Sequence, residues 1–200
     1  MSVQASGLAR PRRGARPPLL DVAAEVLVAD PAASLAEVAE AAGIGRTTLH
    51  KHYATRDDLL RAVGRRAVDL WEQALGQVTD GPDGGLAALI PALVAVGSQL
   101  GFLWRTPALH RDRALVERSR AAEDRTLAVL RRAGERGVLA GDTPDWWLLD
   151  TFFSLIYVAA ESVARGHLAF NDAPRLVTGT FLRGIGAPAG PAPSAEKDSS

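Results

Sequence analysis

The stretch GIGRTTLHKHYATRDDLL, residues 43–60, contains the strongest structural signals of the chain. It opens with two glycines around Ile44, and glycine readily takes the left-handed conformation that ends a helix. The residues that follow are polar except for Leu49 and Tyr53, which are spaced to lie on one face of a helix. Thr55 then precedes two acidic residues, which favour a helix start because they complement the helix dipole. The stretch therefore predicts a helix end, a short polar helix and the start of another helix.

Two more helices are predicted on the N-terminal side of this stretch. Apolar residues recur at helical spacing over 20–28. Ser34, followed three positions later by Glu37, forms a capping box, which satisfies free amide groups at a helix start. The helix that it opens, 35–42, has one apolar stripe and is about two turns long. With the polar helix over 46–53, this arrangement predicts a helix-turn-helix.

The helix-turn-helix pattern by itself leaves two interpretations open. A short amphipathic helix, a glycine turn and a polar helix are typical of a DNA-binding unit whose second helix enters the major groove. A polar helix on the outside of any helical bundle has the same pattern. A non-catalytic helical protein-interaction module is therefore the alternative function. A DNA retardation assay with a salt titration separates the two, because nucleic-acid binding depends strongly on salt.

Residues 20–60 resemble the DNA-binding domain of the TetR family of bacterial transcriptional regulators, and the densest match is 43–60. The chain departs from the usual family pattern at four positions of this stretch: Gly45 stands where serine is common, His50 where tyrosine is usual, Tyr53 where phenylalanine is usual and Arg56 where lysine is usual. The resemblance implies an all-α protein, in which an N-terminal three-helix domain is joined by a long helix to a larger ligand-binding and dimerisation domain. It also implies a repressor that binds a palindromic operator as a homodimer and is released by a small apolar or aromatic effector.

The polar third helix supplies most of the expected DNA contacts. Arg46 and Thr47 are nearest its N-terminus and are expected at base edges, where a guanidinium matches guanine and a threonine methyl packs on thymine. Arg56, where the family usually has lysine, keeps the charge for a phosphate contact. The residues expected to bind DNA are Arg46, Thr47, Thr48, His50, Lys51, His52 and Arg56.

A long helix predicted over 56–78 connects two parts of the chain. Residues 19–53 are too few to bury an adequate core alone, so the first half of this helix is expected to cover them. Its apolar face continues into the second half, which is expected to enter another core. The predicted divisions are a flexible basic arm over 1–18, a helix-turn-helix domain over 19–66, an effector-binding and dimerisation domain over 67–186, and a disordered tail over 187–200.

Four further helices are predicted, over 86–105, 112–136, 146–164 and 173–184. The third of these is apolar on nearly every side and is long enough to cross a membrane. Asp150 and Glu161 within it oppose that interpretation and favour a helix at a subunit interface.

The resemblance implies that the last two helices pair with those of a second copy, and Ile156 and Phe181 are the residues expected in that interface. An effector pocket is expected from apolar faces after Gly85, although each candidate can also be a core residue. The candidates are Leu93, Val96, Leu100, Trp104, Trp147, Phe152 and Tyr157.

Composition, charge and the absence of catalytic motifs exclude several classes of function. The chain has 200 residues, no cysteine and a formal net charge of zero, which excludes disulfides, zinc–thiolate sites and a uniformly basic surface. Ten basic residues against seven acidic ones in residues 1–66 predict a local nucleic-acid face instead. No phosphate loop, HExxH spacing or nucleophile elbow is present, so we expect no catalytic residue, metal or cofactor, and a small helical enzyme is the weakest alternative. With no apolar run before Leu19, the protein is expected to be cytoplasmic.

Overall fold

The structure, a computed structural model, describes residues 18–185, and of Ile185 the backbone alone. Within that range the chain is all α-helical, which confirms the predicted fold class. The elements are α1 (Leu19–Ala29), α2 (Leu35–Ala41), α3 (Arg46–His52), α4 (Arg56–Gly76), α5 (Leu86–Ala95), α6 (Gly97–Arg105), the 3-10 helix η1 (Pro107–Arg111), α7 (Arg113–Glu135), α8 (Asp145–Ala164) and α9 (Ala173–Ile185). The predicted tail lies outside the described residues, as does all of the predicted basic arm except Pro18.

Local signals define the turn between α2 and α3. The predicted capping box is present at the start of α2: the Ser34 backbone amide donates to Glu37 Oε2 over 2.7 Å, and the Glu37 amide donates to Ser34 Oγ over 3.3 Å. At the other end, Gly43 has a φ of 58°, and the Ile44 amide donates to the Ala39 carbonyl over 2.8 Å. This closure satisfies a free carbonyl of α2 and lets the chain reverse into α3.

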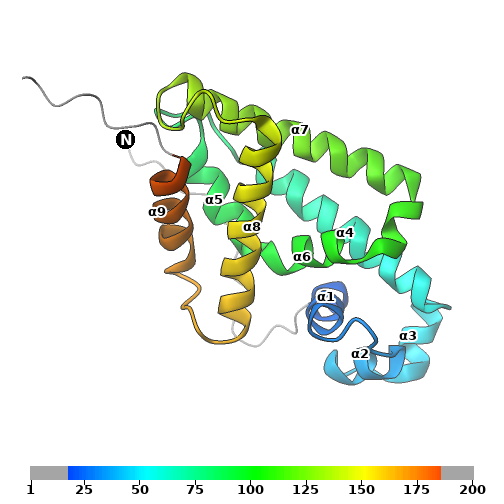
Figure 1. Cartoon of the computed structure of the whole chain (residues 1–200). Helices are drawn as coiled ribbons and strands as arrows, with labels where there is room; N and C mark the ends of the chain where they lie inside the picture. The colour runs from blue at the N-terminus through cyan, green and yellow to red at the C-terminus, as the bar shows by residue number, and fades with distance from the viewer. Residues whose placement is uncertain (1–17, 186–200) are drawn as a thin grey trace, which may run out of the picture.

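The helices α1 to α3 form a small unit at one end of the molecule, and the first half of α4 covers it (Figure 1). Thr55 and Asp58 form a second capping box, which starts α4 beside this unit. The core of the unit consists of buried apolar side chains, which come from all four helices: Ala23, Ala24, Leu27, Val38, Leu49, Leu59, Leu60 and Val63. Because α4 continues into the larger body of helices, one rigid element belongs to both parts.

The prediction of one helix over 86–105 is wrong. The segment forms two helices, α5 and α6, whose axes are bent by 71° at Val96–Gly97. A side-chain carbon added at Gly97 would lie 2.5 Å from the Cβ of Ala160. Glycine is therefore needed for α6 to approach α8 this closely.

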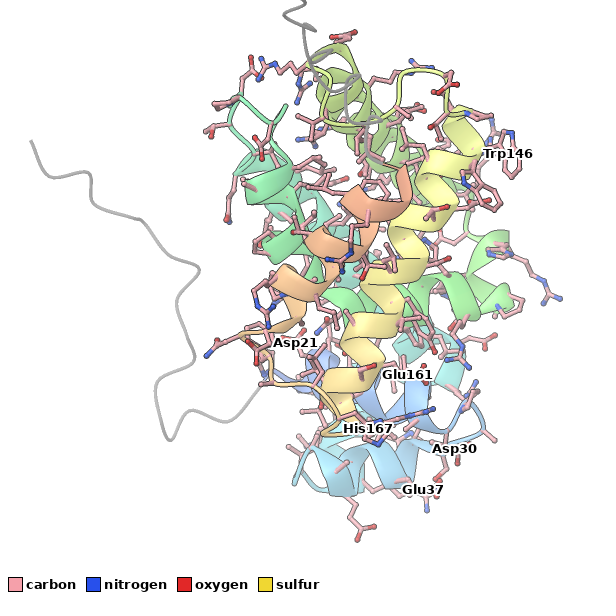
Figure 2. All side chains as sticks on the ribbon, turned by 60° about the vertical axis from the view of Figure 1, so that its left-hand side comes forward. Asp21, Asp30, Glu37, Trp146, Glu161 and His167 are labelled. Atoms are coloured by element: carbon pink, nitrogen blue, oxygen red, sulfur yellow. The ribbon has the colours of Figure 1, made fainter. Side chains whose placement is uncertain are left out.

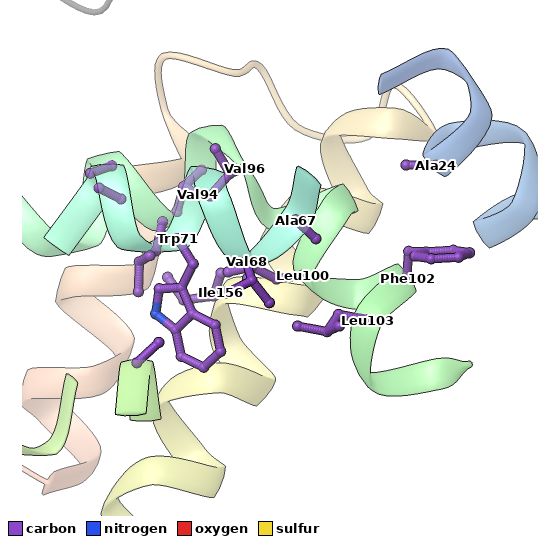
Figure 3. Packing of buried hydrophobic residues seen from close by; sticks show 14 of the residues in the cluster. Ala24, Ala67, Val68, Trp71, Val94, Val96, Leu100, Phe102, Leu103 and Ile156 are labelled. Carbon is purple, nitrogen blue, oxygen red and sulfur yellow. The ribbon is translucent and has the colours of Figure 1, made fainter. Parts of the chain in front are cut away.

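The side chains predicted at the dimer interface, Ile156 and Phe181, are buried inside one copy of the chain, so that assignment is wrong. They are 0% and 1% exposed respectively, and Phe181 packs edge-on against Phe152 with ring centroids 5.3 Å apart. Figure 3 shows Ile156 within the cluster around Trp71. Both α8 and α9 have apolar residues on several faces, and these two residues point inward.

Among the described helices, α8 is long and apolar enough to cross a membrane, and the bent pair α5–α6 passes the same test of length and composition. In the fold, α8 packs against α5, α6, α7 and α9, and it contributes the fully buried Phe152 to the core. Its apolar character is thus explained in part by the core of the larger helical body.

Candidate nucleic-acid interface and effector pocket

Helix α3 presents its polar side chains to solvent at the outer end of the small unit. Leu49 is completely buried and attaches α3 to the core, while Tyr53 is half-buried just beyond its last turn. The remaining residues of α3 are all exposed: Arg46, Thr47, Thr48, His50, Lys51 and His52. The division into inward and outward residues therefore agrees with the sequence prediction. This exposed face carries Arg46 and Lys51 and no acidic residue, so it suits an anionic partner.

Arg56 has a structural role that the sequence did not indicate. Its guanidinium donates hydrogen bonds to the backbone carbonyls of Pro31 and Ala33, in the loop between α1 and α2. These bonds attach the start of α4 to that loop and help to set where α2 and α3 lie. The phosphate contact expected of Arg56 remains a prediction.

A pocket of about 560 Å³ opens between α6, α7 and α8 in the larger body. Two of the predicted pocket residues, Trp104 and Tyr157, line it. The other candidates lie elsewhere: Leu93, Val96, Leu100 and Phe152 are buried core residues, and Trp147 is 51% exposed. Figure 3 shows Val96 and Leu100 within the packed cluster. Most of the predicted pocket residues are therefore core residues, the alternative that the sequence had left open.

The sequence did not indicate that charged groups line this pocket. Glu123 of α7, Asp150 of α8 and Arg105 of α6 all line it, together with the ring of Phe153. Glu123 directly follows Ala122, which belongs to the buried stripe of α7. A carboxylate that flanks an apolar stripe was therefore the signal available in the sequence.

Of the two carboxyl groups that line the pocket, Glu123 has the surroundings that less favour its charged form. Partial burial raises its pKa above the usual value, the charges of Asp124 and Asp150 raise it further, and Arg120 opposes them. Among the described residues, no hydrogen bond or ion pair of Glu123 is formed. By contrast, Arg105 lies over the Tyr157 ring, 5.3 Å from its centroid, and donates to its hydroxyl. The pocket thus combines aromatic faces with a partly buried carboxylate that forms no ion pair among the described residues.

The aromatic side chains of the pocket also contact the long helix. Trp71 of α4 meets Phe153 edge-on with ring centroids 5.3 Å apart, and it meets Trp104 in the same way at 6.1 Å. The Trp104 and Phe153 rings are themselves 4.7 Å apart. These contacts connect the pocket to α4, the helix whose first half covers the unit of α1 to α3.

These features define a class of protein: a helical DNA-binding protein with a helix-turn-helix at one end and a ligand-sized pocket in its other part. The family model for bacterial regulatory proteins of the tetR family matches residues 19–63. A relative, the HTH-type transcriptional repressor LfrR of Mycolicibacterium smegmatis, is 30% identical over 168 residues, which are 82% of this chain and 85% of the relative. The chain belongs to the TetR family, as the sequence resemblance indicated.

Two further comparisons agree with that assignment. The HTH-type transcriptional regulator NfxB of Pseudomonas aeruginosa is 28% identical over 183 residues, which are 86% of this chain and 94% of the relative. The crystal structure of LfrR from Mycobacterium smegmatis in complex with proflavine superposes with a TM-score of 0.68 at 29% identity, covering 84% of this chain and 93% of that one. The protein is thus a DNA-binding transcriptional regulator and not an enzyme.

Proposed function

We propose that this protein is a repressor that binds a palindromic operator as a homodimer and is released by a small planar aromatic cation. Residues 19–66 would bind DNA, and residues 67–186 would bind the effector and the second copy. The observation that carries the proposal is the contact of the pocket rings of Trp104 and Phe153 with Trp71 on α4. This contact links an effector pocket to the helix-turn-helix within one rigid element.

The DNA-binding half of the proposal rests on the exposed face of α3. Arg46 and Thr47 occupy its first turn, the part of a recognition helix that approaches base edges in the major groove. Lys51 lies in the last turn and is suited to a phosphate. A bacterial regulator of this kind would act in the cytoplasm, where the chromosome is.

The proposed effector class follows from the pocket chemistry. The rings of Trp104, Phe153 and Tyr157 offer flat surfaces to a planar ligand, and Glu123 offers a partly desolvated carboxylate to a positive charge. The similar protein LfrR has been crystallised with proflavine, a planar aromatic dye that is cationic at neutral pH. That likeness supports the same class of effector for this chain.

The proposed homodimer rests on exposed apolar side chains of the last two helices. Val158 of α8 is 54% exposed and Leu176 of α9 is 48% exposed, while Phe170 between these helices is 52% exposed. A monomer would leave this surface in water, and a second copy related by twofold symmetry would cover it. Two copies also supply the two recognition helices that a palindromic operator needs.

Thermodynamic linkage tests the proposal. Proflavine is titrated calorimetrically into the free protein and into protein saturated with a duplex recovered by affinity selection from random DNA. If the effector releases DNA, the duplex must weaken proflavine binding by the same factor, about 5- to 150-fold. Equal proflavine affinity in both titrations would contradict release by this ligand. The Glu123→Gln variant serves as the control, because it removes the counter-charge and leaves α3 untouched.

A further inference from the structure

A second cavity lies at the 71° bend between α5 and α6, apart from the effector pocket. It has a volume of about 440 Å³ and is bounded by α1, by the two helix ends at the bend and by the last turns of α8. Its lining shares no residue with that of the effector pocket, although a pocket between them shares Glu25 and Ser98 with this cavity and Arg105 and Tyr157 with the effector pocket. The cavity therefore spans the junction between the α1–α3 unit and the larger helical body. Figure 2 shows the C-terminal part of α8, marked by Glu161, beside that unit.

The walls of this cavity are mostly apolar, and one ionisable side chain lines it among the described residues. Val94, Ala160 and Val163 supply apolar wall, and the exposed Ala164 lies at the rim, so a small molecule can enter. The ionisable residue is Glu25, from the second turn of α1. A ligand bound here would touch both halves of the molecule.

One acceptor that lines the cavity lacks a partner within the described part of the chain. Glu25 forms no ion pair, because the nearby basic residue Arg66 binds Asp21 over 3.2 Å instead. Partial burial, with the charge of Asp21 as a second cause, raises the pKa of the Glu25 carboxyl. A carboxylate without a donor is the complement of an ammonium group.

We propose that this cavity is a second ligand site, which takes a small apolar primary amine in its ammonium form. The ammonium group donates to the Glu25 carboxylate, and the Ser98 hydroxyl is available as a second acceptor. The hydrocarbon part of the amine packs on Val94, Ala160 and Val163. The two neighbouring cations have other partners: Arg165 is bonded to Glu161 over 2.8 Å, and Arg105 donates to the Tyr157 hydroxyl.

The site is tested on the whole protein with hexylammonium as the probe and methyl-labelled alanine and valine as reporters. Hexylammonium should shift the methyl signals of Val94, Ala160 and Val163. The neutral analogue hexan-1-ol should bind more weakly than hexylammonium by a factor of about ten or more. Glu25→Gln should weaken hexylammonium binding by about tenfold. Glu40→Gln, a change at an exposed carboxyl of α2, should leave it unchanged.

Two further variants keep the test decisive. Ala164→Phe plugs the rim from an exposed position and should abolish the shifts without disturbing the fold. Glu123→Gln, in the effector pocket, should leave hexylammonium binding unchanged, so this inference can fail or hold independently of the proposed function. Unmoved signals of Val94, Ala160 and Val163 in the wild type would overturn the proposal. Equal affinity for hexylammonium in the wild type and Glu25→Gln would do the same.

Discussion

The indole Nε1 of Trp71 donates a hydrogen bond to Oγ1 of Thr126 over 3.2 Å, and both side chains are completely buried. Thr126 Oγ1 in turn donates to the Ala122 carbonyl over 2.9 Å within α7. The bond fixes the orientation of the Trp71 ring, which faces Trp104 and Phe153, two aromatic side chains of the pocket between α6, α7 and α8. Helix α4 is thus attached to α7 at the same residue through which the pocket contacts it.

Replacing Trp71 with phenylalanine should destabilise the protein. The change removes the hydrogen bond to Thr126 and leaves a void in the core, so the free energy of unfolding should fall by about 2 kcal/mol. Chemical denaturation measures this difference. Trp146→Phe is the matched control, because Trp146 is 63% exposed and lies far from the α1–α3 unit (Figure 2), and its effect should stay within about 0.5 kcal/mol. Equal effects of the two substitutions would contradict the structural role of Trp71.

Glu123→Gln should stabilise the protein at neutral pH while it weakens binding of a cationic ligand. The folded state raises the pKa of Glu123 above 4.5, so its stabilising contribution is present below that pH and is lost as pH rises through the folded pKa. Glutamine does not ionise, so the variant does not lose this stability as the pH rises. The melting temperature of the variant should therefore exceed that of the wild type at pH 7 but not at pH 3.

The matched control for this prediction is Glu40→Gln, at an exposed carboxyl of α2. It should change neither the melting temperature difference between pH 3 and pH 7 nor the affinity for proflavine. If Glu123→Gln lowered the melting temperature at pH 7, the carboxylate would have a stabilising partner that this account lacks.

Arg46→Ala and Lys51→Ala should weaken DNA binding in different ways. Loss of a guanine contact at Arg46 should cost about 1 to 3 kcal/mol on the selected duplex and much less on random DNA. Loss of a phosphate contact at Lys51 should weaken both complexes alike and reduce the salt slope by about one. Fluorescence anisotropy over a range of salt concentrations measures both effects. The assignment of Arg46 to a base would be wrong if its substitution weakened both duplexes equally.

Val158→Glu should break the dimer and leave each copy folded. Val158 is 54% exposed on α8, so a charge there meets water in the monomer and an apolar surface in the dimer. Phe181→Glu should instead unfold the chain, because Phe181 is 1% exposed in the core. Sedimentation equilibrium and circular dichroism distinguish the two outcomes. A dimer that persists in both Val158→Glu and Leu176→Glu would place the interface elsewhere.

The sequence predicted the helix-turn-helix well because its signals are local. The Ser34–Glu37 box, the glycine turn at Gly43 and the cap at Thr55 each involve residues within a few positions of one another. Their geometry does not depend on the rest of the fold. Hence the predicted bounds of α1 to α4 agree with the observed ones to within about two residues.

The larger body was predicted less well because its details depend on distant contacts. The helix pair α5–α6 bends beside Gly97, where α6 contacts Ala160, which lies more than sixty positions away in the chain. In the same way, α8 is apolar on several faces, so periodicity could not decide that Ile156 faces the core and Val158 faces outward. The pocket position of Glu123 could not be predicted either, because it is one of many alternating charges along α7 and only contacts with other helices distinguish it.

The most direct test of the account is affinity selection from a library of random DNA duplexes, with the wild type and the triple variant Arg46→Ala, Thr47→Ala, Lys51→Ala in parallel. The wild type should enrich an inverted repeat whose half-sites lie about 10 base pairs apart, or a multiple of that spacing. The triple variant should enrich no sequence, although it should fold and dimerise normally because these side chains are exposed. Enrichment of the same repeat by the triple variant, or of no sequence by the wild type, would contradict the claim that α3 reads operator DNA.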